Sequence, residues 1–215
     1  MTDKQTTTAM VPLKGEIVNN SAKRLAVRRW KDYMGEDVPH LDIERVRRVI
    51  EAATNERDQL LIKTLFDGCF RVSEAIGIRP RDIIQDATGW VINIIGKGGL
   101  HSTVAVSPSL VAQIQSYAYR YNVPPDTRIF TINRFRVHQI VSRAMADAGV
   151  VKPDGVGAVH VLRHSGALER LKLTGNPKAV QEQLRHRDPR MTLRYMKTLS
   201  RKEAIEIQKG VDYQW

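Results

Sequence analysis

The chain has 215 residues, enough for one large domain with a stable hydrophobic core and too few for two full-size domains. Its composition, 42% hydrophobic and 27% charged, is that of a globular protein, and its longest apolar runs are far too short to span a bilayer, which excludes a membrane protein. Lysine and arginine outnumber aspartate and glutamate by 34 to 23, and the resulting net charge of +11 favours a polyanionic partner, nucleic acid ahead of an anionic membrane.

The first residues carry no export signal. No apolar stretch follows a basic start in MTDKQTTTAMVPLKGE, and the single cysteine, Cys69, cannot form an internal disulfide. We therefore expect a cytosolic protein in which Cys69 is a buried core residue.

Positive charge is concentrated in two stretches. Residues 1–38 are predicted to form a flexible basic N-terminal arm with a short helix near 21–34, and a second basic stretch runs from 160 to 202. Such excesses are typical of surfaces that track phosphates, although solvated helix faces have the same composition. The residues expected to contact DNA are Lys23, Arg24, Arg28, Arg29, Arg185, Arg187, Arg190, Arg194 and Lys197.

The compact domain is expected to begin near Pro39 with helices. Apolar positions three and four residues apart predict a helix over 41–54. Asn55 is expected to cap the next helix, and Gly68 to end it. A short helix over 71–76 follows.

The pattern then changes from helical to β-branched. Short runs at 90–95 and 103–106 flank a glycine-rich turn, which predicts an antiparallel hairpin with Lys97 at its tip. Further helices are predicted at 108–122, 133–148, 160–173, 177–185, 189–197 and 201–210. The expected fold is mostly α-helical with one small antiparallel β-sheet.

The later helices carry clear boundary signals. Gly175 is expected to end the helix over 160–173. Asp188 is expected to cap the helix over 189–197, with a proline in its first turn, and Ser200 and Glu203 have the spacing of a capping box.

The first candidate for chemistry is the sequence HVLRH. Spacings of three and four place His160, Arg163 and His164 on one helical face. The two histidines have the spacing of a zinc helix, but Val161 stands where a metalloprotease has its glutamate. A zinc hydrolase that uses these histidines together with His186 is an alternative that metal analysis would test.

Three further features belong to the candidate site. Arg71 and Glu74 are one helical turn apart, which fits either a surface ion pair or a carboxylate that orients an arginine toward an anion. Lys97 lies in a turn whose glycines allow close approach to a ligand. Tyr195 lies in the most basic part of the chain, where positive charge would attract a phosphate and stabilise a phenolate.

Taken together, these residues resemble the catalytic set of the tyrosine recombinase, or phage integrase, family. The resemblance covers roughly residues 40–200 and rests on the order and spacing of Arg71 with Glu74, Lys97, His160-x-x-Arg163, His186 and Tyr195, and on the stretch LRHRDPRMTLRYMK. It implies the tyrosine recombinase catalytic-domain fold over 39–200. The sequence departs from the family in two places: Arg185 replaces a usual glycine, and the segment before residue 39 is too short for the family's helical core-binding domain.

The resemblance implies an enzyme that transfers DNA strands by transesterification. Tyr195 would be the nucleophile and form a covalent 3′-phosphotyrosine. Arg71 and Arg163 would bind the nonbridging phosphate oxygens, for which their planar guanidinium groups are suited. Lys97 would be the general acid.

The remaining site residues have supporting roles in this resemblance. His160 would help to move the Tyr195 proton and His186 would donate a hydrogen bond to the phosphate, roles that favour pKa values near neutral. Glu74 would support Arg71, and His164 stands next to the catalytic arginine. We expect no metal site, no cofactor and no need for magnesium.

The resemblance also implies partners. These are double-stranded DNA, three further copies of the chain in a homotetramer on DNA, with monomers or dimers free in solution, and an accessory DNA-bending protein. The reaction would integrate, excise or resolve a mobile element or replicon, in the cytoplasm and associated with the nucleoid, with no role for a membrane. Residues 201–215 are expected to form a C-terminal helix and tail that docks either on a neighbouring subunit or on its own domain.

Two other functions remain open at this point. One is a type IB topoisomerase-like enzyme that nicks and rejoins DNA with a comparable residue set. The other is a DNA-binding regulator or accessory protein that keeps the fold and works without cleavage.

Overall fold

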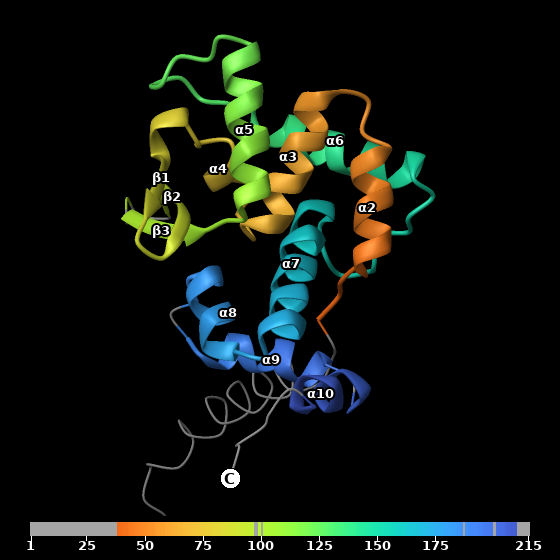
Figure 1. The fold of residues 1–215 in the computed structure, drawn as a ribbon. Helices are drawn as coiled ribbons and strands as arrows, with labels where there is room; N and C mark the ends of the chain where they lie inside the picture. Colours follow the sequence, from red (N-terminus) through yellow and green to blue (C-terminus); the bar gives the residue numbers. More distant parts are fainter. Residues whose placement is uncertain (1–37, 97–98, 100, 187, 200, 210–215) are drawn as a thin grey trace, which may run out of the picture. The chain divides into compact units, whose positions relative to one another are not determined.

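A small sheet lies at one edge of a group of helices in the computed structural model, which describes residues 38–96, 99, 101–186, 188–199 and 201–209, with the backbone alone at 201 and 202 (Figure 1). The helices are α2 (Ile43–Glu51), α3 (Glu56–Asp67), α4 (Val72–Ala75), the 3-10 helix η1 (Pro80–Asp82), α5 (Pro108–Arg120), α6 (Arg134–Asp147), α7 (Ala158–Thr174), α8 (Pro177–Leu184), α9 (Arg190–Thr198) and α10 (Arg201–Gln208). The strands are β1 (Ile83–Asp86), β2 (Gly89–Ile95) and β3 (His101–Ala105). The mostly helical fold class is confirmed. None of the described helices is both long and apolar enough to cross a membrane.

The sheet is antiparallel, in the order β1-β2-β3. Ile92 of the central strand lies opposite Ile83 on one side and Val104 on the other. The predicted hairpin is confirmed, whereas β1 was not predicted. Strand β1 has four residues, of which three are exposed, so it shows no apolar alternation that reveals a strand.

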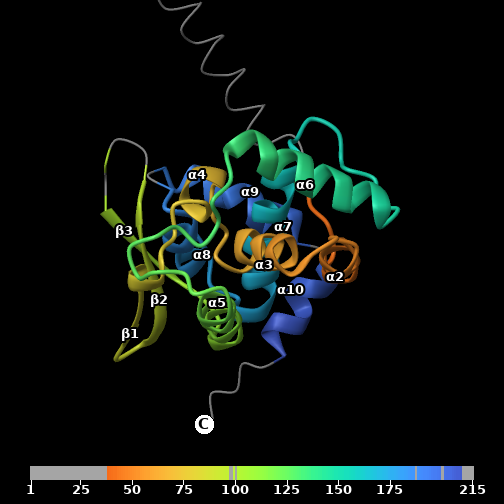
Figure 2. The same ribbon diagram turned by 90° about the horizontal axis from the view of Figure 1, so that it is seen from above.

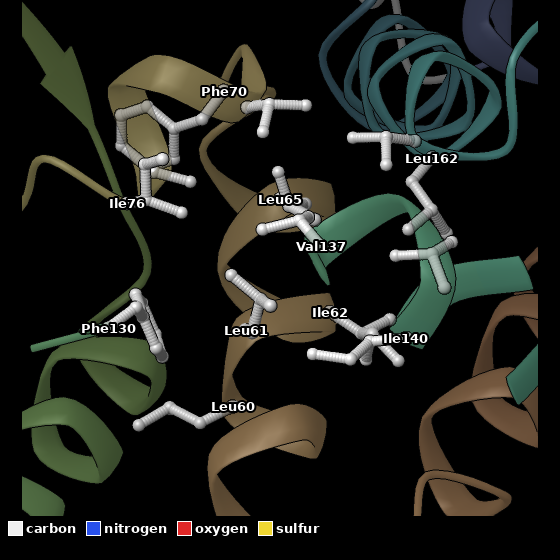
Figure 3. Packing of buried hydrophobic residues seen from close by; sticks show 14 of the residues in the cluster. Leu60, Leu61, Ile62, Leu65, Phe70, Ile76, Phe130, Val137, Ile140 and Leu162 are labelled. Carbon is white, nitrogen blue, oxygen red and sulfur yellow. The ribbon is translucent and has the colours of Figure 1, made fainter. Parts of the chain in front are cut away.

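Helix α3 lies at the centre of the main hydrophobic core. In both views the sheet and α2 lie on opposite sides of it (Figures 1 and 2). Its Leu61, Ile62 and Leu65 are completely buried. Figure 3 shows these side chains grouped with Val137 of α6 and Leu162 of α7. Burial of this apolar surface is the main favourable contribution to the stability of the fold.

Helix α3 begins and ends where predicted, but the residue that takes the left-handed conformation at its end is not the expected glycine. Asn55 caps the helix as expected, since its side chain accepts from the backbone N–H of Asp58. The helix ends at Gly68, but Gly68 has φ −77° and the left-handed residue is Cys69, with φ 49°. Gly68 is needed for another reason, because a Cβ there would lie 2.0 Å from the Phe70 ring. Cys69 is fully buried, as expected, and burial raises the pKa of its thiol.

The last helices follow the predicted boundaries with one shift. Gly175 ends α7 in the left-handed conformation, as expected. Pro189 is the N-cap of α9 and not its first residue, and Asp188 lies one position further back, where its Oδ1 accepts from the Arg190 backbone N–H at 3.0 Å. The expected capping box cannot be traced, because Ser200 is outside the described residues.

Helix α10 packs against α7 of the same chain. Lys172 Nζ of α7 and Glu203 Oε1 of α10 form an ion pair at 2.6 Å. A Cβ at Gly175 would lie 2.7 Å from a methyl carbon of Ile207, so this helix end also approaches α10 closely.

A second, smaller hydrophobic cluster joins α7, α8 and α9 at the lower end of α7 (Figure 1). Its buried members are Val38, Cys69, Ala167, Leu168, Leu171, Val180, Leu184 and Tyr195. Gly166 allows α7 to approach the end of α3 closely, because a Cβ there would lie 2.1 Å from the Phe66 carbonyl oxygen. This close approach places the residues that follow α3 beside Arg163.

Candidate functional site

The site is built around the buried carboxylate of Glu74. The backbone N–H of Arg71 donates to Oε2 and the Arg71 Nη1 donates to Oε1, both at 2.7 Å. Arg185 Nη2 donates to Oε2 at 2.6 Å, and Arg163 Nη1 lies 3.8 Å from the same oxygen. Burial alone would raise the pKa of Glu74, but Arg185 and the hydrogen bonds from Arg71 outweigh it and hold that pKa below its usual value. The carboxylate is therefore ionised at neutral pH.

Arg163 holds three parts of the chain together. Its Nη1 donates to the Cys69 carbonyl and its Nη2 donates to the Leu184 carbonyl, the latter at 2.7 Å. Burial lowers the pKa of Arg163 to about 10, and neighbouring arginines add to the effect. The group still carries its positive charge at neutral pH, so α7 brings a fixed cation into the site.

Arg71 differs from Arg163 in its exposure. Its side chain is 41% exposed, whereas that of Arg163 is 4% exposed. Glu74 accepts a hydrogen bond from the Arg71 Nη1, and the Arg71 side chain remains partly exposed to solvent. The pair is therefore no ordinary surface ion pair, because its carboxylate is buried; the orienting role stays a prediction.

Three histidines and Tyr195 lie close together beside these arginines. The ring centroids of His160 and His164 are 5.4 Å apart, and those of His164 and Tyr195 are 5.9 Å apart. The ring centroids of His186 and Tyr195 are 6.2 Å apart. His160 is exposed at the start of α7, while His164 and His186 are half-buried. The expected face of His160, Arg163 and His164 therefore exists, with Arg163 turned inward.

The histidine pKa values differ from the near-neutral values that we expected. Burial lowers the pKa of His164 to about 4, and that of His186 to about 4, with Arg163 adding to the effect at His186. Burial also lowers the pKa of His160. All three imidazoles are therefore neutral at pH 7. A neutral imidazole accepts a proton from a phenol or donates an N–H bond, but it brings no charge to a phosphate.

Tyr195 lies in an apolar environment. Its side chain belongs to the second hydrophobic cluster and the residue is 4% exposed. Burial raises the pKa of Tyr195 to about 12, although Arg163 acts in the opposite direction. Arg163 and Arg194 thus favour the phenolate as expected, but desolvation of the buried phenol outweighs them, so the net shift is upward.

The basic residues expected to contact DNA have different environments. Lys197 and Arg190 lie exposed on α9, and Arg190 forms an ion pair with Asp188 at 2.9 Å. Arg194 is half-buried, and Arg185 points inward to Glu74. The remaining candidates, Lys23, Arg24, Arg28, Arg29 and Arg187, lie outside the described residues, as does Lys97.

Two polar residues that support the site were not predicted from the sequence. Thr192 is buried, and its hydroxyl lies 3.4 Å from His186 Nδ1. Gln183 Nε2 donates to the Ala105 carbonyl at 2.9 Å and to the Gly68 carbonyl at 3.2 Å, which ties α8 to the end of β3 and to the end of α3. Thr192 stands within the stretch LRHRDPRMTLRYMK and Gln183 just before it, but no pattern there marked either one as a site residue.

The zinc-hydrolase alternative requires three ligands that converge on one point. Within the part of the chain that the structure describes, no three His, Cys, Asp or Glu side chains are grouped closely enough to hold a metal ion. The geometry thus lends no support to that reading.

Comparisons with known proteins agree with this architecture. The family model described as the phage integrase family matches residues 39–201. The tyrosine recombinase XerC of Pelobacter propionicus is 30% identical over 168 residues, which cover 73% of this chain and 54% of that protein. This chain thus spans about half the length of that relative.

Two solved structures share the fold. The catalytic domain of bacteriophage HP1 integrase has a TM-score of 0.61 and 20% identity, covering 81% of this chain and 96% of that domain. The XerH site-specific recombinase, solved bound to its palindromic difH substrate as a post-cleavage complex, has a TM-score of 0.65 and 20% identity, covering 80% of this chain and 53% of its own. The fold is thus that of a recombinase catalytic domain.

Proposed function

Since the chain belongs to the phage integrase family, we propose that it is a site-specific recombinase, which cleaves and rejoins DNA strands through a 3′-phosphotyrosine at Tyr195. The observation that carries the proposal is the pairing of Arg71 with Arg163 on one buried carboxylate, next to Tyr195 and a row of neutral histidines. Two fixed guanidinium groups beside an oxygen nucleophile form a site for a phosphodiester.

The chemistry is a transesterification. The Tyr195 Oη attacks the phosphorus, the bond from phosphorus to the 5′ oxygen breaks, and the phosphate stays attached to the DNA 3′ oxygen. The phenol proton passes to a neutral imidazole, with His160 as the acceptor that the family implies and His164 between the two rings. The departing 5′ oxygen takes its proton from Lys97. Rejoining is the same reaction in reverse, so the energy of the phosphodiester bond is conserved.

The arginines stabilise the charge that grows on the nonbridging oxygens during attack. Arg163 is fixed by two backbone carbonyls and Arg71 by Glu74, so neither needs to reorganise when that charge develops. His186 donates a neutral N–H bond to the same phosphate. Because guanidinium groups supply this stabilisation, the reaction proceeds without a metal ion or a cofactor.

Attack requires a change at Tyr195. The phenol is 4% exposed within an apolar cluster, and its pKa of about 12 keeps it protonated. Binding of DNA therefore has to expose the Oη, and a movement of the short helix α9, whose other face is exposed, is the simplest way to do so.

Double-stranded DNA is the proposed substrate, and its proposed contacts are the exposed Arg190 and Lys197 of α9 together with the basic residues of the N-terminal segment. The net charge of +11 and the DNA-bound state of the XerH relative support this choice. On DNA the chain acts as a homotetramer with an accessory DNA-bending protein, in the cytoplasm at the nucleoid, as in the reaction scheme that the family implies. The outcome is integration, excision or resolution of a mobile element or replicon.

The proposal is tested by trapping covalent complexes. A supercoiled plasmid with native flanking DNA is incubated with wild-type protein, Tyr195→Phe or Tyr119→Phe, and the reaction is stopped with SDS. Tyr119 is 86% exposed on α5 and serves as the matched control. We expect protein-linked DNA with wild type and Tyr119→Phe, and none with Tyr195→Phe. DNA binding by all three proteins without any covalent product would contradict the proposal and favour a regulator that binds DNA without cleavage.

A further inference from the structure

Arg185 has an unusual backbone conformation. With φ 55° and ψ 43° it is left-handed, a conformation that costs a non-glycine residue about 1 kcal/mol. Glycine would remove this strain while leaving the turn after α8 intact. An arginine held in this conformation therefore points to a function of its side chain.

The Arg185 side chain lies inside the site. Its Nη2 donates to Glu74 Oε2 and its Nη1 donates to the Gln183 carbonyl, both at 2.6 Å. The guanidinium carbon lies 6.0 Å from the centroid of the Phe70 ring. The side chain is 12% exposed, against 41% for Arg71, so its position is unlike that of an arginine that tracks phosphates on a surface.

The carboxylate of Glu74 has more cations around it than it can neutralise. Arg71, Arg163 and Arg185 all lie within 4 Å of it, so the group carries two positive charges in excess. Without Arg185 the excess would be one, and Glu74 would be neutralised only by the two arginines that are to bind phosphate. The transition state for attack on a phosphodiester gathers about two negative charges, which matches the larger excess.

We propose that Arg185 is a positioning residue: it binds Glu74 Oε2 and so leaves the guanidinium groups of Arg71 and Arg163 directed at the scissile phosphate. This inference rests on the proposed function of those two arginines. It replaces the expectation that Arg185 contacts the DNA backbone, because in the folded chain its side chain points inward to Glu74.

The test compares Arg185→Gly with wild type. Glycine suits the left-handed position and Glu74 keeps Arg71 and Arg163 as partners, so we expect the variant to fold, and circular dichroism of both proteins checks that it does. Asn122→Gly is the matched control, because Asn122 is an exposed left-handed residue, with φ 50°, in the turn after α5. Arg185→Lys keeps a charge that reaches Glu74 but loses the planar pair of bonds. The measurements are the rate of covalent complex formation at saturating protein on the plasmid above, and the salt dependence of DNA binding.

We expect Arg185→Gly to slow covalent complex formation at saturation by about 10- to 100-fold, the usual effect of a group that orients a catalytic residue. Arg185→Lys recovers part of the rate, and Asn122→Gly reacts like wild type. The slope of log affinity against log salt stays unchanged, whereas loss of a phosphate contact would reduce it by about one.

One result would overturn the inference alone, namely an Arg185→Gly protein that reacts at the wild-type rate at saturation. A reduced salt slope in that same protein would show instead that Arg185 contacts the DNA backbone. Absence of covalent product from wild type is a different result, because it overturns the proposed function and this inference with it.

Discussion

Replacement of Glu74 by glutamine tests the charge cluster in the absence of DNA. The Glu74 side chain is 1% exposed, and Arg163 and Arg185 beside it are 4% and 12% exposed. Glutamine has nearly the same shape, but its neutral amide leaves both buried guanidinium groups without an anion. Removal of one partner from a buried ion pair costs about 3–5 kcal/mol. We therefore expect Glu74→Gln to lower the free energy of unfolding by about 3 kcal/mol, which corresponds to about 6–12 °C in Tm for a domain of this size.

Urea unfolding followed by circular dichroism measures this loss directly. Glu44→Gln is the control, because Glu44 pairs with Arg47 at 2.5 Å while both side chains are more than 60% exposed, and such pairs contribute about 0.5 kcal/mol or less. A loss below about 1 kcal/mol for Glu74→Gln would refute the argument that this carboxylate compensates buried cations.

The difference in free energy of unfolding between wild type and Glu74→Gln should also depend on pH, which provides a second test. The pKa of Glu74 is lower in the folded chain than its ordinary value of 4.5. Its contribution to stability is therefore complete above that value and is lost as the pH falls through the folded pKa. The stability difference between wild type and Glu74→Gln should stay constant from pH 8 to pH 5 and narrow only in more acidic solution.

Three further predictions concern packing, histidine and metal. Gly166→Ala should lower the free energy of unfolding by about 1–3 kcal/mol, because the added Cβ would lie 2.1 Å from the Phe66 carbonyl oxygen. The control Gly157→Ala has open space around its Cβ and should lower that free energy much less. Equal urea midpoints for the two variants would contradict the prediction. The folded pKa of His164 is about 4, below its ordinary 6.5, so the contribution of His164 to stability is complete above pH 6.5 and declines toward pH 4. Between pH 7 and pH 5 the free energy of unfolding of His164→Gln should therefore fall less steeply than that of wild type. Parallel curves for the two proteins would be inconsistent with a buried neutral imidazole. Covalent complex formation should proceed equally well in excess EDTA and in magnesium, since arginines stabilise the phosphate charge, and its complete loss on chelation would refute a metal-free mechanism.

Local signals along the chain predicted most of the helices. Asn55 and Gly175 stand at the helix boundaries where capping chemistry puts them, and the glycine-rich turn indicated the hairpin. Strand β1 was not predicted because three of its four residues are exposed and show no alternation of apolar and polar side chains. Its pairing with β2 is therefore decided by tertiary contacts.

The sequence analysis named the residues of the candidate site, but it did not predict their burial or the shifts in their pKa values. Spacing placed Arg71 with Glu74 and His160 with Arg163, because each pair lies within one helical turn. Burial depends on how α7, α8 and α9 pack, which no local pattern specifies. For that reason the raised pKa of Tyr195, the lowered pKa values of the histidines and the inward direction of Arg185 became visible only in the folded chain.

The most direct test of the proposed chemistry is the identity of the bond between protein and DNA. Trapped complexes are digested with nuclease and protease, the linked peptide is sequenced by mass spectrometry, and the freed DNA end is tested for labelling by polynucleotide kinase. The mechanism predicts a nucleotide remnant on Tyr195 and a free 5′ hydroxyl that accepts the label. A remnant on another residue, or a linkage through a 5′ phosphate, would contradict it.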